Sequence, residues 1–205
     1  MRSLCYNAPH LTKKRKSVKR VLQCLFVSCV LSAGLVAQEY EIDKAHSHVG
    51  FKVKHLKVSS VRGDFQDYSA IIDYDPASHT FKKLEATIKA DSINTRNSKR
   101  DTHLRSDDFF KVAEYPDLHF VMHEYQKLDS KRGRVVGTLN IAGVSHKVVL
   151  QAEIGGIAQQ NGRKKLGFSL NGKINRADFK FAPSTSIHSV GDAIALNIEV
   201  EAAQK

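Results

Sequence analysis

Cysteine is missing from most of this chain of 205 residues. The three cysteines are Cys5, Cys24 and Cys29, and none follows before Lys205. The chain after Cys29 can therefore form no internal disulfide, which excludes a small scaffold held together by disulfides. Export into a bacterial periplasm is compatible with this cysteine usage.

A long apolar run is also missing. The uncharged apolar stretch Val21–Val36 is shorter than the roughly 20 residues that a membrane-spanning helix needs. It follows a basic segment without acids, and small residues lead from it to Ala37. This order is typical of a secretory signal peptide. We therefore predict a leader over residues 1–37 with cleavage near Ala37, although Gly34 fits as well, and a periplasmic or secreted domain over residues 38–205. An uncleaved membrane anchor stays open as the alternative.

Acidic residues are absent before Glu39, and this changes the meaning of the net charge of +11. The leader holds seven of the 32 lysines and arginines, which leaves a charge near +4 on residues 38–205. The basic character belongs mostly to the targeting segment, so nucleic acid is not an expected partner. The length from residue 38 to 205 suffices for one domain with a core.

Most of the domain alternates between apolar and polar residues, which predicts half-buried antiparallel strands. We expect about eight strands joined by short turns, and therefore a sandwich or a barrel. The predicted strands lie in the ranges 39–54, 65–74, 84–90, 118–125, 135–141, 148–154, 166–171 and 194–200. Turns are predicted at Gly63-Asp64, at 75–78 and at 142–145, with a flexible connection over 155–165. A barrel of this size is either filled by side chains or holds one small ligand, and the pattern leaves both open.

The stretch from Ala90 to Pro116 breaks the alternation. Its spacing predicts one or two short helices, with Ser106 or Asp107 as the N-cap before Phe109 and Phe110. Basic and amide side chains beside two phenylalanines suit an amphiphile, with rings for its tail and polar groups for its head. The alternative is a helical plug that fills one end of a barrel.

Several motifs resemble those of the YceI-like family of exported lipid-binding proteins. They begin with Tyr40-x-Ile42-Asp43-x-x-His46-Ser47-x-Val49-x-Phe51 and continue with the long stretch from Ala90 to Phe110. Further motifs lie at 137–145, 174–179 and 190–192. After Phe179 the chain reads Lys180-Phe181-Ala182-Pro183 where the family often has Gly and a small, polar run, so the resemblance does not extend to the shape of this loop.

This resemblance implies a mainly β, lipocalin-like antiparallel β-barrel with the short helices inserted mid-chain. It implies a central cavity that holds a polyisoprenoid quinone or phosphate, or a fatty-acid amide, and no catalysis and no cofactor. It also implies that a homodimer can form, and that the membrane is contacted only to load or unload the ligand. A lipid-processing enzyme (isomerase or hydrolase) and a stress-response protein with an incidental cavity stay open as alternatives.

Inward parity and the resemblance together predict the ligand-binding residues. The apolar set is Phe51, Val53, Ile88, Leu104, Phe109, Phe120, Met122, Leu139, Ile141, Phe168 and Leu170. Three arginines are candidates for the head group, namely Arg100, Arg105 and Arg176, because a guanidinium suits phosphate or carboxylate. The alternative for each arginine is a structural role, with Asp101 and Asp178 as local partners.

Metal ligands and a catalytic centre are not predicted. His46 and His48 share one face if the strand is unbroken, but no cysteine or acidic set completes a usual metal site, so structural hydrogen bonds are expected for His46 and His103. No nucleotide-binding loop and no nucleophile elbow is present. Ser47 lies next to two histidines in sequence, but neighbours along a strand point to opposite faces.

Overall fold

The structure is a computed structural model that describes Met1 and residues 38–205. The predicted leader and its cleavage site lie outside the described residues, apart from Met1. Among the described residues, no helix combines the length and the apolar character needed to cross a membrane.

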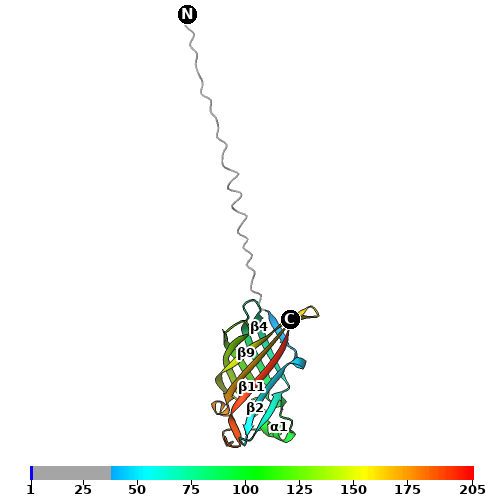
Figure 1. The fold of residues 1–205 in the computed structure, drawn as a ribbon. Helices are drawn as coiled ribbons and strands as arrows, with labels where there is room; N and C mark the ends of the chain where they lie inside the picture. The colour runs from blue at the N-terminus through cyan, green and yellow to red at the C-terminus, as the bar shows by residue number, and fades with distance from the viewer. Residues whose placement is uncertain (2–37) are drawn as a thin grey trace. The chain divides into compact units, whose positions relative to one another are not determined.

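The described chain is mainly β-structure with one α-helix (Figure 1). Its strands are β1 (Glu39–Ile42), β2 (His48–His55), β3 (Ser59–Phe65), β4 (Tyr68–Asp75), β5 (Thr80–Lys89), β6 (Ile93–Asn94), β7 (Asp117–Lys127), β8 (Arg132–Ile141), β9 (Val144–Gln160), β10 (Arg163–Asn175) and β11 (Val190–Gln204). The helix is α1 (Ser98–Arg105), and short 3₁₀ turns are η1 (Lys44–His46), η2 (Ala90–Ser92) and η3 (Arg176–Phe179).

The strands close into an antiparallel barrel. Eight strands form the ring in the order β1-β4-β5-β7-β8-β9-β10-β11, and β1 pairs with β11 to close it. β2 pairs with the remaining part of β11, and β3 and β6 follow β2 in the sheet. The prediction of an antiparallel barrel of about eight strands is therefore confirmed. Because a closed ring leaves few free strand edges, its backbone groups are paired and its interior is shielded from water.

Three neighbouring strands are interrupted at the same level. η1 separates β1 from β2, Gln66 and Asp67 separate β3 from β4, and η2 separates β5 from β6. Bonds across the break hold the segments together: Lys89 N donates to the Asp67 carbonyl over 2.9 Å, and Lys44 Nζ lies 2.7 Å from Asp67 Oδ1. The prediction of one unbroken strand over 39–54 is wrong, because Asp43 accepts a hydrogen bond from Ala45 N at 3.1 Å and starts η1.

The core lies inside the ring and follows the expected period of two. On β10, Leu166, Phe168 and Leu170 are buried, while Asn171 is exposed. Burying such a side chain stabilises the fold by about 1.5–3 kcal/mol. The alternation thus sets which residues face the interior of the barrel.

The single α-helix begins earlier than its predicted position. Asn97 is the N-cap of α1, and its side chain accepts a hydrogen bond from Arg100 N over 3.0 Å. Ser106 instead ends the helix, since its hydroxyl donates to the His103 carbonyl over 2.8 Å. The N-cap predicted at Ser106 or Asp107 is therefore wrong, and Phe109 and Phe110 lie in the turn that follows.

Two segments that the sequence predicts as connections form strands in the structure. β3 runs through Gly63-Asp64, and the turn lies instead at residues 56–58. β9 and β10 extend through most of 155–165 and meet at a turn over Asn161-Gly162. Gly162 has a φ of +77° at this turn, which a glycine adopts without strain.

Candidate functional site: an apolar cavity in the barrel

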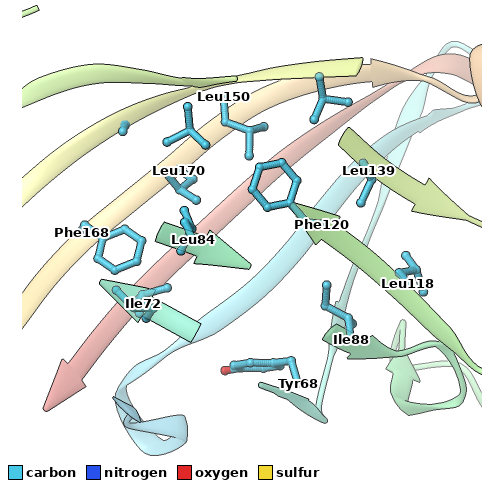
Figure 2. Close-up of a cluster of buried hydrophobic side chains, with 14 of the residues drawn as sticks. Tyr68, Ile72, Leu84, Ile88, Leu118, Phe120, Leu139, Leu150, Phe168 and Leu170 are labelled. Atoms are coloured by element: carbon cyan, nitrogen blue, oxygen red, sulfur yellow. The ribbon is translucent and has the colours of Figure 1, made fainter. Parts of the chain in front are cut away.

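The barrel contains a cavity of about 200 Å³. Its wall is apolar almost throughout, and most barrel strands contribute to it. Figure 2 shows Phe120, Leu139, Leu150 and Leu170 pointing into this shared interior. Along β10 the wall runs from Phe168 to Ile174, roughly 20 Å of strand. The cavity is therefore narrow, elongated and apolar.

The predicted apolar residues lie on this wall with one exception. Those that line the cavity are Phe51, Val53, Ile88, Leu104, Phe109, Phe120, Leu139, Ile141, Phe168 and Leu170. Met122 is half-buried and packs against the core, but it does not line the cavity. It lies farther along β7 beside a register shift, toward the filled end of the barrel. Whether the lining residues bind a ligand stays a prediction.

Aromatic side chains fill the end of the barrel beyond Phe168. The Phe81 ring lies 4.9 Å from that of Phe168, 5.0 Å from Tyr74 and 5.4 Å from Tyr125, measured between centroids. Tyr74 is fully buried, and its desolvation raises its pKa to about 12. These edge-to-face and tilted contacts give a tightly packed floor.

A second aromatic cluster lies at the opposite end, where α1 is found (Figure 1). The Phe181 ring lies 4.7 Å from the ring of Phe110 and 5.8 Å from that of Phe109, and all three line the cavity. Phe65 meets Phe110 edge-to-face at 5.8 Å. We call Phe109, Phe110 and Phe181 the aromatic mouth.

The aromatic mouth contains two residues outside the predicted ligand-binding set. Phe110 belongs to the phenylalanine pair for which the sequence suggests contact with a ligand tail, and Phe181 lies in the loop after Phe179. The signal for Phe181 was the segment Lys180-Phe181-Ala182-Pro183 itself, because it places an aromatic residue directly after the motif at 174–179. Other unpredicted wall residues include Phe65, Tyr68, Ile72, Ile174, Phe179 and Ile198.

Arg100 and Arg105 do not line the cavity. Arg100 Nε donates to Thr95 Oγ1 over 2.7 Å, and Asp101 accepts from Thr95 N over 2.9 Å. Arg105 Nε donates to the Asp91 carbonyl over 2.7 Å, and its Nη2 to the Ile93 carbonyl over 2.9 Å. Both arginines therefore fasten α1 to the chain before it, which is the structural role considered for them. A head-group role for either remains only a prediction.

Arg176 differs because it is buried and lines the cavity. Its Nη1 donates to the Ala182 carbonyl over 2.6 Å, and its Nη2 to the Thr185 carbonyl over 2.5 Å. The residue thus shapes the loop that carries Phe181. Asp178, its predicted local partner, instead lies within 3.8 Å of His146 Nε2.

A polar cluster on the barrel joins Asp43, His46, Glu201 and Lys165. Asp43, His46 and Glu201 lie close enough to share a cation, but Lys165 Nζ already lies 3.1 Å from Asp43 and 2.5 Å from Glu201. Hydrogen bonds from His46 and Lys165 lower the pKa of Asp43 to about 2. Bonds to Glu201 and Asp43 raise the pKa of Lys165.

The two histidines expected to make structural hydrogen bonds, His46 in this cluster and His103 in α1, both lie beside carboxylates. His46 Nδ1 lies 3.0 Å from Asp43 Oδ2, and His103 Nε2 lies 3.3 Å from Asp108 Oδ2. His46 ends η1 whereas His48 begins β2, so the two do not share one strand as the unbroken pattern implied. The cluster of Asp43, His46, Lys165 and Glu201 is therefore an ion-pair network that ties η1 and its N-cap to β10 and β11.

The ring of eight strands and the enclosed apolar space define the class: a closed antiparallel β-barrel with an internal cavity. Residues 40–202 match the family model described as the YceI-like domain. The chain therefore belongs to the YceI-like domain family, as the motifs in the sequence indicated.

Relatives of known sequence or structure support this family assignment. Protein YceI of Escherichia coli O157:H7 is 34% identical over 191 residues, which cover 91% of this chain and 98% of that protein. The crystal structure of the YceI protein of Campylobacter jejuni is 60% identical, covers 80% of this chain and 96% of its own, and has a TM-score of 0.71. A polyisoprenoid binding domain from Saccharophagus degradans, at 16% identity, a TM-score of 0.62 and coverage of 81% of this chain and 98% of its own, shares the fold.

Proposed function

We propose that the protein binds one long-chain amphiphile in its cavity and carries it without chemical change. The observation that carries this proposal is an apolar cavity with a packed floor at one end and the aromatic mouth at the other. The polyisoprenoid-binding name of a relative with this fold supports the same class of ligand. The ligand classes are a polyisoprenoid quinone or phosphate, or a fatty-acid amide.

The energetics favour such a ligand. Each methylene that moves from water into an apolar wall gains about 0.8 kcal/mol. A chain that extends from the mouth toward Phe168 therefore binds well without strong polar contacts, although its ordering offsets part of the gain. A freely soluble polar metabolite gains nothing from this wall.

The place of action follows from the sequence and belongs to the proposal. The leader over 1–37 directs export, so the carrier acts in the periplasm or outside the cell. Its apolar ligand resides in membranes, so the protein contacts a membrane only to load or unload it. A homodimer is part of the same proposal, and light scattering of the purified protein measures it.

Native mass spectrometry of protein purified from its own producing cells tests the function. We expect a single additional mass that denaturation releases, and extraction identifies it as an isoprenoid or fatty-acyl compound. Incubation of that compound with the protein should return it unaltered. A protein without any bound lipid that also fails to take up long-chain compounds contradicts the proposal, and an altered compound points to an enzyme.

A further inference from the structure

The turn between β2 and β3 exposes two large apolar side chains. Val58 is 84% exposed and Leu56 is 55% exposed. A third such residue, Ile187 in the connection over 180–189 before β11, is 59% exposed. Apart from Met1, these are the three most exposed large hydrophobic side chains of the described residues. We call Leu56, Val58 and Ile187 the exposed rim. None of the three lines the cavity, so a ligand inside the barrel does not cover them.

The exposed rim adjoins the aromatic mouth. Leu56 N donates to the Ser189 carbonyl over 3.0 Å, which joins the turn to the connection before β11. The same connection carries Phe181 of the aromatic mouth. Val190, which pairs with His55, lines the cavity. The rim therefore lies at the end of the barrel that holds α1, away from the packed floor (Figure 1).

The turn is built from residues that suit its backbone poorly. Leu56 has a φ of +49° and Lys57 a φ of +60°, and Val58 N donates to the His55 carbonyl over 3.2 Å. Two positive φ values are the requirement of a type I′ turn, for which Asn-Gly is the usual pair. Leucine and lysine are costly there, because their Cβ atoms are crowded in the left-handed region. An exposed leucine held at such a cost indicates a function for the turn.

The chain around the exposed rim is basic. Neither the segment 44–63 nor the segment 179–191 contains an acidic residue. Lys54, Lys57 and Lys180 are exposed. No ion pair among residues 38–205 includes any of the three. Their charges are therefore available to an anionic partner.

The combination of apolar and basic groups points to one kind of partner. An anionic bilayer offers negative headgroups above an apolar interior, and it needs no shaped pocket to receive exposed side chains. Nucleic acid offers the charge without the apolar layer. Two exposed acidic residues at this end, Asp107 and Asp108, follow α1 and not the rim, and Asp108 lies 3.3 Å from His103 Nε2. Positive charge therefore prevails beside the rim.

Resting on the proposed function, we infer that the exposed rim docks onto an anionic phospholipid bilayer and presents the aromatic mouth to it. The rim side chains enter the boundary between headgroups and acyl chains, while the lysine ammonium groups stay at the level of the phosphates. A ligand that leaves the bilayer then meets Phe181 without crossing bulk water. The sequence predicts contact with a membrane, and the rim assigns this contact to one face of the barrel and to one charge of lipid.

Sedimentation with vesicles tests the inference. Protein purified from its own producing cells is mixed with vesicles of phosphatidylcholine alone, or with vesicles of equal parts phosphatidylcholine and phosphatidylglycerol. We expect binding to the anionic vesicles to be tighter by about tenfold or more, because each lysine near such a surface contributes roughly fivefold. High salt should remove most of this difference, since it screens exposed charges.

Replacing Leu56-Lys57 by the usual pair of the turn separates docking from folding. Leu56→Asn/Lys57→Gly suits a type I′ turn, so its thermal midpoint should not fall. Its binding to anionic vesicles should weaken about tenfold, because one apolar side chain and one charge are lost. Leu128→Asn/Lys131→Gln is the matched control, since Leu128 is 53% exposed in the turn after β7, beyond Tyr125 of the packed floor. Its binding should not change.

A tryptophan reports which end of the barrel meets the bilayer. The chain contains no tryptophan, so Val58→Trp and Leu128→Trp each give a single signal. We expect the emission of Val58→Trp to shift to shorter wavelength on anionic vesicles, because its ring enters the apolar boundary. The emission of Leu128→Trp should stay unchanged.

The outcomes separate this inference from the proposed function. Equal binding to both kinds of vesicle, or unchanged binding of Leu56→Asn/Lys57→Gly, overturns docking through the rim and leaves a lipid carrier in place. Polyglutamate that binds as tightly as the anionic vesicles, with no emission shift in Val58→Trp, overturns the bilayer as the partner and points to an acidic protein. Failure of long-chain compounds to bind in solution without vesicles overturns the proposed function, whatever the vesicles show.

Discussion

At the scale of single residues, Asp43 and Lys165 make stability depend on pH. The folded-state pKa of Asp43 is about 2, below its ordinary value of 3.8, because His46 and Lys165 donate hydrogen bonds to its carboxylate. A lowered pKa contributes stability that is fully present above about pH 4 and is lost as the pH falls toward 2. Lys165 has a raised pKa, so its contribution is lost only as the pH rises beyond 10.5.

Asp43→Asn should therefore make the free energy of unfolding less dependent on pH under acidic conditions. We expect the free energy of unfolding, measured by denaturant titration, to fall less between pH 4 and 2 in this variant than in the unaltered protein. Asp91→Asn is the control, since the Asp91 carboxylate makes no hydrogen bond or ion pair with the described residues. If the free energy of unfolding of Asp43→Asn falls as steeply between pH 4 and 2 as that of the unaltered protein, Asp43 is not the source of the acid sensitivity.

Phe181 offers a second prediction at this scale. Its ring closes the aromatic mouth against Phe109 and Phe110. Phe181→Ala should cost about 1–2 kcal/mol of stability, because the ring is only half-buried. It should also speed release of a bound fluorescent fatty-acyl probe, measured by stopped flow.

Ile187→Ala is the matched control for Phe181→Ala. Ile187 lies in the same connection before β11 but is 59% exposed, so its loss should leave the release rate unchanged. Equal release rates in Phe181→Ala and the unaltered protein contradict a closing role for the ring.

At the scale of elements, α1 depends on its N-cap more than on the burial of an apolar face. Asp101 is its only buried residue, so the helix gains little from an apolar face. Asn97 caps it through Arg100 N. We expect Asn97→Ala to cost about 1 kcal/mol and Asn97→Asp much less, because aspartate caps equally well. Hydrogen exchange at residues 98–105 measures the change, and equal protection in both variants contradicts it.

The elements also show what the sequence could and could not reveal. Alternation located the strands because one face of each is buried, as at Leu166, Phe168 and Leu170. It did not reveal η1, because local hydrogen bonds from Ala45 N and His46 N to Asp43 break the strand without disturbing the apolar pattern. The N-cap was misplaced because both Asn97 and Ser106 are residue types that cap helices, and the local hydrogen bond from Arg100 N to the Asn97 side chain starts the helix at the earlier one.

The cavity wall likewise contains residues that the sequence pattern could identify and residues that it could not. Strand parity gave Phe120, Leu139 and Leu170, since register fixes which face turns inward. Phe181 lies in the connection after η3, which has no strand periodicity, so parity could not place it on the wall. Met122 has the right parity but lies where the barrel is filled, and parity carries no information on depth along a strand.

At the scale of the whole molecule, the barrel is hollow over one part of its length and filled over another. Ala86 lines the cavity, whereas Ala152 is buried among packed side chains and does not line it. The same enlargement should therefore have opposite effects at these two positions. A packed core rejects added volume at a cost of about 1–3 kcal/mol, while an open space accepts it.

Ala86→Phe should leave the thermal midpoint nearly unchanged and weaken binding of a fatty-acyl probe at least tenfold, because the new ring occupies the space of the tail. Ala152→Phe should lower stability by about 1–3 kcal/mol and leave probe affinity per folded molecule intact. Calorimetry and probe titration on both variants give the four values. If Ala86→Phe is destabilised as strongly as Ala152→Phe, the interior is packed throughout and the barrel has no room for a ligand.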